Sequence, residues 1–574
     1  MDSPLISAGQ KLLADIQKLK VNFRLDDGSV QQISVADIEK QPFLAMGRHH
    51  GLIRDVSRIN AIDLISRLRI RDSFTYMFKH GPAERMAFTP ENVQLMKDLG
   101  KSMLDLTLTV ESEKADPQVN DSVIDSGYTY FGQFVDHDIT RDDTSQFEPL
   151  QDANKIPNLR TPNLDLDAIY GQGPALSSHL YAGIKLRTGP VFTGGFNNIN
   201  DSGMITDLPR DREGKSPLAG DNRNDENLIV QHLHLGFLCY HNAVVDALKL
   251  ENPGLSDASL FANAQREVRR HYQWVVLNDF LRTICGDATV DDVLQNGVKF
   301  FNNPVNFFTG AIRMPVEFSV ASYRFGHSMI RDVYNFNKNF PKRKFSFAFL
   351  FTGQGGNTSG TGDGDQKGQL HAAWRINWNR FFSTANHQAE NKARKTDTRV
   401  ALHMGQLPGF TDANVNFMAM LSSRNLVRGL ALGVPTGQAV AQQMGITPLT
   451  ETQLKANPFE NALLVPSVTP EQQDLHNQTL GILSTNDNAL CKQTPLWFYI
   501  LKEAEVLQQG NQLGPVGGRI VTEVFVRMLK QSRESILNNP AWKPRFGTDA
   551  NGHLRIIDIL GFAGRVPAQD APEQ

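Results

Sequence analysis

The sequence contains little cysteine and no long apolar run. Its three cysteines, Cys239, Cys285 and Cys491, form no CxxC pair. That number excludes a disulfide framework and favours a reducing compartment or a fold that needs no cross-links. The N-terminal stretch lacks the apolar core of a signal peptide, and no stretch approaches the roughly 20 apolar residues of a membrane span. We therefore expect no membrane span, with a cytoplasmic location by default and secretion as the alternative.

The chain also has no large excess of positive or negative charge. Lysine and arginine total 58 against 61 aspartates and glutamates, which gives a formal net charge of −3. The chain therefore has no electrostatic reason to bind nucleic acid or an anionic membrane. Strand-like alternation is scarce and no internal repeat is evident, so we predict a mainly α fold in one large domain. The sequence leaves the oligomeric state open.

Three regions are expected along the chain. They are a helical N-terminal arm packed on the core (residues 1–100), the main domain (101–565) and a disordered tail (566–574). In the arm, Ala61–Ile70 has helical apolar spacing, and Thr89-Pro90 has the cap and proline that begin a helix. The pair His49-His50 is interpreted as surface residues, because adjacent side chains diverge on a helix.

Polar and ionisable residues that could take part in catalysis are most concentrated in Tyr128–Thr140, YTYFGQFVDHDIT. Read as a helix, this segment has a buried aromatic stripe at the i, i+3, i+4 spacing. Gln133 and His137 are four apart and share one face, while Asp136 and Asp138 project about 100° to either side of His137. Burying three ionisable groups together is unfavourable unless each has a partner. A helix end with a surface histidine is the alternative.

Oxygen-bearing residues alternate with apolar ones in Asn158–Gly171, NLRTPNLDLDAIYG. In an extended loop this alternation places the oxygens on one side, where they suit calcium. The residues concerned are Thr161, Asn163, Asp165 and Asp167. The spacing is not that of an EF-hand, and a plain acidic turn is the alternative.

A long buried helix is predicted within Pro217–Leu248, with Arg223 and Glu226 on one face at its start. Its histidines, His232, His234 and His241, lack the HExxH arrangement of zinc enzymes. We interpret these three as buried structural histidines.

Two further helical segments carry polar pairs at a spacing of three. Arg324 and His327 lie in Arg313–Val333, and Asn425 and Arg428 lie in Leu421–Gln438, whose helix should end before Gly433. A lone histidine in such a helix is more often a core residue than a ligand. Residues 353–368 are glycine-rich and are expected to form a flexible loop. Residues 495–529 read as two helices joined by a turn at 510–519.

Four of these motifs, in this order, resemble the animal-type heme peroxidase (peroxidase–cyclooxygenase) superfamily, whose members include myeloperoxidase and lactoperoxidase. They are GQFVDHD (132–138), GDNRNDE (220–226), YRFGHS (323–328) and RNLVRG (424–429). The C-terminal segments TPLWFYILKEAEV and LGPVGGRIV also look like bacterial members of the group. The resemblance implies a heme peroxidase fold, with residues 101–565 as the catalytic domain.

The resemblance also implies a role for each matched residue. His137, Arg223 and Gln133 match the distal histidine, arginine and glutamine, and His327 matches the proximal ligand of the heme iron. Asn425 would accept a hydrogen bond from His327, Arg428 would pair with a heme propionate, and Arg324 would border the cofactor. Asp136 and Glu226 match the carboxylates that form esters with heme b. The matched calcium ligands are Asp138, Thr161, Asn163, Asp165 and Asp167.

The implied activity is reduction of hydrogen peroxide through an oxyferryl intermediate, with oxidation of halides, pseudohalides or small organic donors. Asn227 stands where myeloperoxidase has the methionine of its sulfonium link, so at most two ester bonds are expected. Arg324 occupies the position of the catalytic tyrosine of the fatty-acid oxygenases, the first alternative function. A non-enzymatic heme-binding or adhesion protein is the second.

Overall fold

The fold is described from a computed structural model. It describes the backbone of 20–24 and 30–34, and then 73–107, 120–142, 151–190, 206–210, 217–303, 312–344, 374–407, 416–459 and 468–566. The expectations for His49-His50, for Ala61–Ile70, for the glycine-rich loop and for nearly all of the tail lie outside the described residues.

The chain divides into two compact units, Met1–Arg71 and Asp72–Gln574. In the first unit, β1 (Lys20–Arg24) pairs antiparallel with β2 (Val30–Ser34), and Val21 lies opposite Ile33. The first segment, KVNFR, alternates apolar and polar residues, and the intervening LDDGS is rich in turn-forming residues. The region expected to be helical therefore contains a strand pair. The division after Arg71 also differs from the boundary expected at residue 100.

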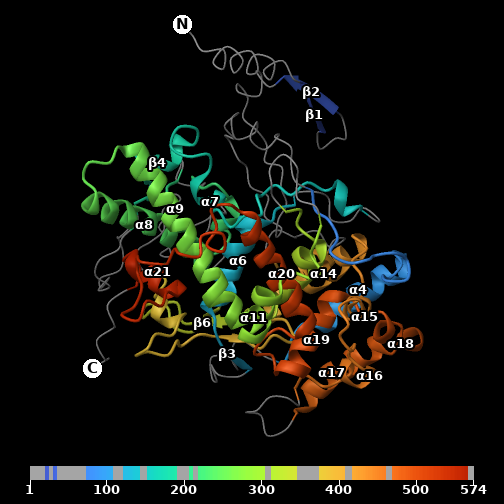
Figure 1. Cartoon of the computed structure of the whole chain (residues 1–574). Helices are drawn as coiled ribbons and strands as arrows, with labels where there is room; N and C mark the ends of the chain where they lie inside the picture. Colours follow the sequence, from blue (N-terminus) through green and yellow to red (C-terminus); the bar gives the residue numbers. More distant parts are fainter. Residues whose placement is uncertain are drawn as a thin grey trace, which may run out of the picture. The chain divides into compact units, whose positions relative to one another are not determined.

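The second unit is built mainly from helices (Figure 1). The α-helices are α4 (Pro90–Ser102), α6 (Gly127–Ile139), α7 (Asp167–Tyr170), α8 (Leu228–Glu251), α9 (Asp257–Val275), α10 (Leu281–Cys285), α11 (Asp287–Asn296), α13 (Asn416–Ala419), α14 (Leu421–Ala431), α15 (Gly437–Gln443), α16 (Glu451–Leu454), α17 (Pro470–Leu483), α18 (Thr485–Lys492), α19 (Leu496–Gln508), α20 (Pro515–Gln531) and α21 (Ile556–Phe562). This mainly α architecture confirms the predicted fold class.

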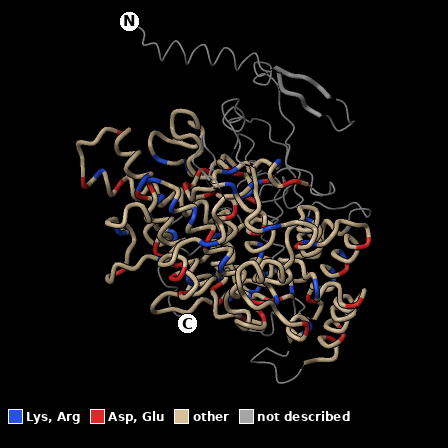
Figure 2. The backbone as a smooth tube through the Cα atoms, turned by 45° about the vertical axis from the view of Figure 1, so that its right-hand side comes forward, with Lys and Arg blue, Asp and Glu red and all other residues tan. Residues whose placement is uncertain are grey.

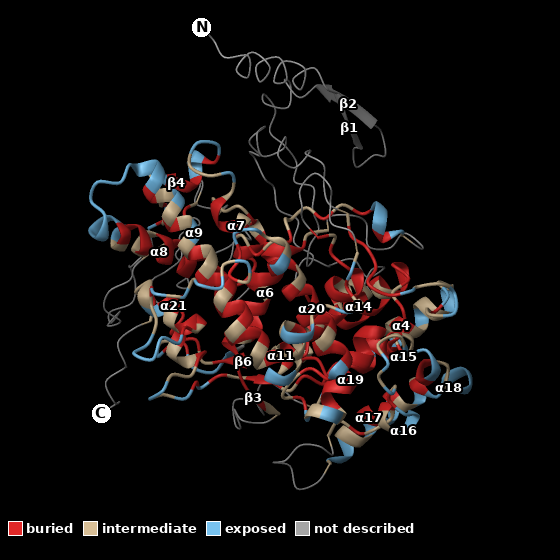
Figure 3. Ribbon diagram, viewed as in Figure 1, coloured by how far each residue is buried: buried red, intermediate tan, exposed pale blue. Residues whose placement is uncertain are grey.

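Helix α6 runs through the middle of this unit and packs on α8, which in turn packs on α9 (Figures 1 and 3). Its apolar stripe is buried as predicted. Phe134 stacks on Phe237 of α8 with ring centroids 4.9 Å apart, and Phe131 meets Tyr272 of α9 edge to face at 6.3 Å. These ring contacts fix the rotation of α6 about its axis, and so fix the direction in which its polar residues point.

Strands are few and short among the described residues of this unit. They form three antiparallel pairs, in which β3 (Asp121–Asp125) pairs with β8 (Lys392–Arg394), β4 (Tyr181–Ala182) with β5 (Lys185–Leu186), and β6 (Val333–Tyr334) with β7 (Arg343–Lys344). Strand β3 leads directly into α6, so the β3–β8 pair anchors the N-terminal end of that helix.

Several helix boundaries follow the sequence signals. Helix α4 begins after Thr89, whose side chain accepts from the Asn92 N–H, and α14 ends at Ala431, before Gly433. The long helix predicted within 217–248 begins only at Leu228, because Asn227 caps it by accepting from the N–H groups of Ile229 and Val230. Helix α20 begins at Pro515, inside the turn predicted at 510–519.

The segment around His327 is not the α-helix that its spacing predicted. Residues Glu317–Ala321 (η5) form a π-helical turn, and Ser322–His327 (η6) form a 3₁₀ helix. Phe318, Phe325 and Met329 are nevertheless buried as expected. A 3₁₀ helix has three residues per turn, so side chains at i and i+3 lie directly above one another on the same face of the helix. Arg324 and His327 are such a pair.

Acidic and basic residues are interspersed along the described chain (Figure 2). None of its helices has both the length and the apolar character that crossing a bilayer requires. The compartment expected from the sequence therefore stays a prediction.

Candidate active site

His137 lies in the last two turns of α6 and is 1% exposed. Its Nδ1 is 2.8 Å from Oδ1 of Asn224, and Asn224 Nδ2 is 2.9 Å from Nδ1 of His234. In this arrangement His137 carries its proton on Nδ1, which leaves Nε2 free to accept one. Burial, followed by the charge of Arg223, lowers the pKa of His137 to about 3. The imidazole is therefore neutral at pH 7.

Arg223 is buried beside His137. Its guanidinium is 2.8 Å from Asp221 and donates to the carbonyl oxygens of His137 at 3.0 Å and Thr140 at 2.8 Å. Burial alone would lower the pKa of Arg223, but the charge of Asp221 outweighs this effect, so that the pKa lies above its usual value. The remaining terminal nitrogen, Nη1, is buried and has no hydrogen-bond partner among the described residues. The site therefore holds a fixed cation with one unused donor.

Glu226 joins the same group. Its Oε1 lies 3.6 Å from His137 Nε2, and it accepts a hydrogen bond from Gln133 Nε2. Gln133 in turn accepts from Asn227 Nδ2 at 3.1 Å. The shared face predicted for Gln133 and His137 is thus present, and both side chains reach one carboxylate of the GDNRNDE segment.

Asp136 points away from that group, as its position on the helix predicted. Its Oδ1 accepts from the Thr140 hydroxyl at 2.8 Å, and its Oδ2 lies 3.1 Å from Nη1 of Arg324. Arg324 is three residues before His327. The ion pair therefore ties helix α6 to the segment that carries the second histidine.

His327 is paired with Asn425 of α14, as expected, with 2.7 Å between His327 Nδ1 and Asn425 Nδ2. The amide nitrogen faces the ring, so Asn425 donates here, whereas the family resemblance implied that it accepts. A half-turn of the amide exchanges the two roles without moving its other atoms. Burial and the charges of Arg324 and Arg424 hold the pKa of His327 well below its usual value. A neutral imidazole is the form that ligates a metal.

Arg428 lies on α14 one turn beyond Asn425. It donates to Gln151 Oε1 at 2.8 Å and forms an ion pair with Asp142. The expected pairing of Arg428 with a heme propionate stays a prediction, since its anionic partner in the structure is Asp142.

Three of the five residues expected to bind calcium form one cluster. Carboxylate oxygens of Asp138, Asp165 and Asp167 lie within 4.8 Å of one another. Leu164 and Leu166 are fully buried, while Asn163, Asp165 and Asp167 are half-buried, so burial alternates along the loop as predicted. Both leucines have positive φ angles, 51° and 56°, so the loop is more tightly curled than an extended segment.

The residues of this cluster suit a hard cation. Asp138 Oδ1 and Asp165 Oδ1 are buried and accept no hydrogen bond from the described residues. Burial, and then repulsion from Asp167 and Asp165, raises the pKa of Asp138 well above its usual value, while that of Asp167 rises to about 6. Arg160 offsets part of this repulsion at 3.1 Å from Asp167. Calcium prefers such oxygen ligands. The backbone of Thr161 hydrogen-bonds to Asp167, and the N–H of Asn163 to the Thr161 carbonyl.

Several observations also fit a heme between the two histidines. The imidazoles are neutral, and Arg223 has an unused donor. A Cβ atom added at Gly326 or Gly429, the neighbours of His327 and Arg428, would meet no atom within 4 Å. Glu226 lies 3.6 Å from His137, and its charge also raises the pKa of Arg424. The charge of Arg424 in turn lowers the pKa of His327. The two histidine sites therefore share their electrostatic surroundings.

Three residues of the site were not singled out from the sequence. Asn224 orients His137, Asp221 holds Arg223, and Trp497 lies 6.4 Å from the ring of His327 and donates to the Arg324 carbonyl at 3.1 Å. The first two lie within GDNRNDE, where a buried polar run next to an arginine was the available signal. The histidines His232, His234 and His241 are buried and hydrogen-bonded, as structural histidines are expected to be.

The family model described as Animal haem peroxidase matches residues 147–453, which is more than half of the chain. The chain belongs to the animal haem peroxidase family. The matched range of this family member contains the acidic loop, GDNRNDE, His327 and α14, and it begins after His137. The resemblance found in the motifs is thereby confirmed.

Alignments to individual relatives are shorter. The chain is 27% identical over 197 residues to "Peroxidasin homolog pxn-2" of Caenorhabditis elegans, covering 33% of this chain and 14% of that protein. It is 28% identical over 149 residues to human lactoperoxidase, covering 24% and 20%. It is 22% identical over 387 residues to human eosinophil peroxidase, covering 64% and 48%. The chain thus matches less than half of the length of each of these relatives.

Among solved structures, peroxidase A of Dictyostelium discoideum matches with a TM-score of 0.55 and 14% sequence identity. The match covers 87% of this chain and 95% of that one. At this identity the likeness shows the fold alone.

Proposed function

We propose that this protein is a heme peroxidase that reduces hydrogen peroxide and oxidises halides, pseudohalides or small organic molecules. The observation that carries the proposal is the pairing of His137, a buried neutral base, with Arg223, a buried cation that has an unused donor. This pair suits the movement of one proton and the stabilisation of one developing negative charge, as cleavage of a peroxide bond requires.

Each residue has a distinct task in this proposal. His137 Nε2 takes a proton from one peroxide oxygen and returns it to the other, while Asn224 keeps the opposite ring nitrogen protonated. Arg223, held by Asp221, stabilises the negative charge on the departing oxygen. Gln133 orders the polar groups beside Glu226.

His327 would hold the iron and Arg428 a propionate of the heme, with Arg324 at the cofactor's edge. The bound heme would supply the electron-transfer chemistry. Asn425 would fix the ring of His327 through its hydrogen bond. Asp136 and Glu226 would supply at most two ester links. Asn227 has no sulfur, and its side chain caps α8.

We propose calcium at the cluster of Asp138, Asp165 and Asp167, with Thr161 and Asn163 as the remaining ligands from the chain. Because Asp138 directly follows His137, an ion there would fix the end of α6 against the acidic loop. We also propose that residues 101–565 are the catalytic domain, together with α4, which packs on α14.

A fatty-acid oxygenase on the same scaffold has less support. Arg324 takes the position of the tyrosine that such enzymes need, and it is bound to Asp136. The neighbouring Tyr323 stacks on Phe318 with ring centroids 4.6 Å apart, and its hydroxyl is buried with no hydrogen-bond partner among the described residues. Oxygen uptake with linoleate in the absence of peroxide would support this second function.

The test compares His137→Ala with His241→Gln, each loaded with heme and matched for heme content. His241 is equally buried but bonds to Tyr170 and Ile184 away from the site. We expect His137→Ala to keep its heme and lose turnover with peroxide by about 100-fold or more, while His241→Gln stays near the wild-type rate. Equal rates for His137→Ala and wild type would show the assignment to be wrong.

A further inference from the structure

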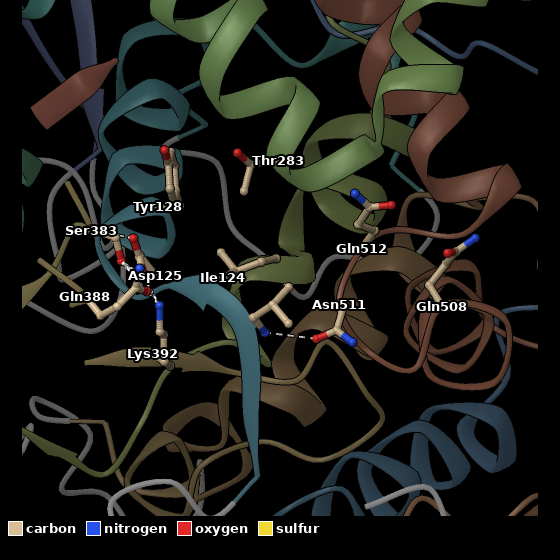
Figure 4. A pocket seen from close by; sticks show the side chains of 11 residues that line it. Ile124, Asp125, Tyr128, Thr283, Ser383, Gln388, Lys392, Gln508, Asn511 and Gln512 are labelled. Carbon is tan, nitrogen blue, oxygen red and sulfur yellow. Dashed lines mark hydrogen bonds and ion pairs between the residues drawn. The ribbon is translucent and has the colours of Figure 1, made fainter. Parts of the chain in front are cut away.

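A polar pocket of about 470 Å³ opens beside the N-terminal end of α6 (Figure 4). Its lining includes Tyr128 of α6, Lys392 of β8, and Gln508 and Gln512 near the α19–α20 connection. His137 lies nine residues farther along α6, which is about 14 Å of helix axis. The pocket is therefore distinct from the candidate active site, yet one helix connects them.

The charged groups of this pocket are matched internally. Asp125 forms an ion pair with Lys392 and accepts from the Ser383 N–H at 2.6 Å and its hydroxyl at 2.9 Å. The side-chain amides of Gln508 and Gln512 make no hydrogen bond with any described residue, and Figure 4 shows them in the lining of the pocket. Such a site favours a neutral ligand with hydrogen-bonding groups over a halide or another anion.

Tyr128 supplies the one phenol group among the side chains that line the pocket. Its hydroxyl donates to Asp279 Oδ1 at 2.6 Å, and Asp279 Oδ2 accepts from the Ile556 N–H at 2.9 Å. Asp279 belongs to the π-helical segment η4 (Val276–Phe280), a type of irregularity that is frequent at functional sites. Burial raises the pKa of Asp279 to about 6, and burial together with this carboxylate raises the pKa of Tyr128 well above its usual value. Tyr128 is thus a neutral phenol with a proton acceptor already in place.

We propose that this pocket binds a neutral phenol, and that Tyr128 relays electrons from it to the active site. The inference rests on the proposed peroxidase function, which supplies the oxidised centre. Tyr128 gives one electron to that centre and its proton to Asp279. The bound phenol then gives one electron to the Tyr128 radical, which recovers its proton from Asp279, and the phenol's own proton goes to water. Each cycle moves one electron and yields one phenoxyl radical and one proton.

The chemistry of Tyr128 selects the ligand class. A phenol carries the same functional group as the tyrosine side chain, so electron exchange between them is close to balanced, whereas a sugar offers no comparable one-electron chemistry. Val123, an exposed residue of the lining, supplies an apolar wall for an aromatic ring, and the two glutamine amides can bond the hydroxyl of the phenol.

The first test compares guaiacol and iodide oxidation by the heme-loaded wild type, Tyr128→Phe and Tyr181→Phe. Tyr181 is the matched control, because its hydroxyl bonds to the Tyr170 carbonyl outside the pocket. We expect Tyr128→Phe to lower guaiacol turnover by about tenfold and to leave iodide turnover unchanged, with both rates preserved in Tyr181→Phe. Equal losses for the two donors in Tyr128→Phe, or no loss, would overturn the relay.

Two further measurements do not depend on turnover. After rapid freezing with peroxide, electron paramagnetic resonance should show a tyrosyl radical that Tyr128→Phe lacks and Tyr181→Phe retains. Equilibrium dialysis of guaiacol without peroxide should show binding that the double variant Gln508→Ala/Gln512→Ala weakens. If the wild type oxidises neither iodide nor guaiacol with peroxide, the proposed function fails, and the dialysis experiment still tests whether the pocket binds a phenol. Guaiacol binding unaffected by the double variant would remove the pocket from the proposal.

Discussion

Asp136 Oδ2 lies 3.1 Å from Arg324 Nη1, and this ion pair joins the two segments that carry His137 and His327. Each partner comes from a different helical element, and both side chains are largely buried. Removing one partner of such a pair leaves the other charge buried without compensation. The pair therefore fixes the relative placement of the two histidines and contributes to the stability of the fold.

In protein that has not been exposed to peroxide, the Arg324→Met variant should lower the free energy of unfolding by about 3 kcal/mol, because it leaves the Asp136 carboxylate uncompensated. Urea denaturation of the wild type and the variant measures the difference. The control is Arg282→Met, which removes a more exposed partner of Asp287 and Asp291 and should change stability by less than about 1 kcal/mol. Equal effects of the two variants would show that the Asp136–Arg324 pair has no special structural role.

Replacing Asn224 should affect the reaction of peroxide through the tautomer of His137. In Asn224→Leu nothing holds the proton on Nδ1, and the bimolecular rate with peroxide should fall by about tenfold to 100-fold. The Asn224→Asp variant keeps an acceptor for Nδ1–H and adds a negative charge, which should raise the pKa of His137. As the pH is lowered, the stopped-flow rate of this variant should therefore begin to fall at a higher pH than the rate of the wild type. Identical rates in Asn224→Leu and wild type would contradict the role of Asn224.

Chelation of calcium should destabilise the protein. An ion that binds only the folded state at 100 times its dissociation constant adds about 2.7 kcal/mol of stability. Thermal unfolding in EGTA should therefore occur at a lower Tm, and added calcium should restore it. In Asp165→Asn the calcium-dependent shift should shrink, whereas Asp549→Asn, an exposed carboxylate elsewhere, should retain it. A Tm that changes with neither EGTA nor calcium would exclude the proposed calcium site.

The buried histidines should make stability fall as the pH drops below about 6.5, whereas buried carboxyls with a raised pKa, such as Asp279, act in the opposite direction. Burial lowers the pKa of His232 to about 3, and those of His241 and His271 to about 4. Between those values and the ordinary histidine pKa of about 6.5, the unfolded chain binds protons that the folded chain does not, so stability rises with pH. Urea midpoints at pH 4.5, 5.5 and 7 measure the slope, and the variant His241→Gln should reduce it. Equal slopes for the wild type and His241→Gln would contradict the buried neutral state of His241.

Covalent attachment of heme is tested by extraction. After exposure to peroxide, acid–acetone should leave heme on the wild type, less on Asp136→Asn or Glu226→Gln, and none on the double variant. Complete extraction from the wild type would show that neither carboxylate forms an ester.

The sequence predicted those parts of the site that depend on local spacing. The face shared by Gln133 and His137, the alternation of the acidic loop and the cap at Thr89 all follow from helix or strand periodicity. The pairing of Asn224 with both His137 and His234 joins three segments, and no spacing rule contains that information. The π-helical and 3₁₀ turns before His327 were missed for a similar reason, since packing against α14 and α19 rather than local propensity sets them.

The most direct test of the whole account is an optical spectrum of the purified, heme-loaded protein before and after one equivalent of hydrogen peroxide. We predict a heme absorption band that shifts with peroxide and returns when iodide or guaiacol is added. In His137→Ala the initial band should be present, and its shift should be slowed by orders of magnitude. A wild-type protein that retains no heme, or whose band does not respond to peroxide, would contradict the proposal that His137 and His327 serve one peroxidase centre.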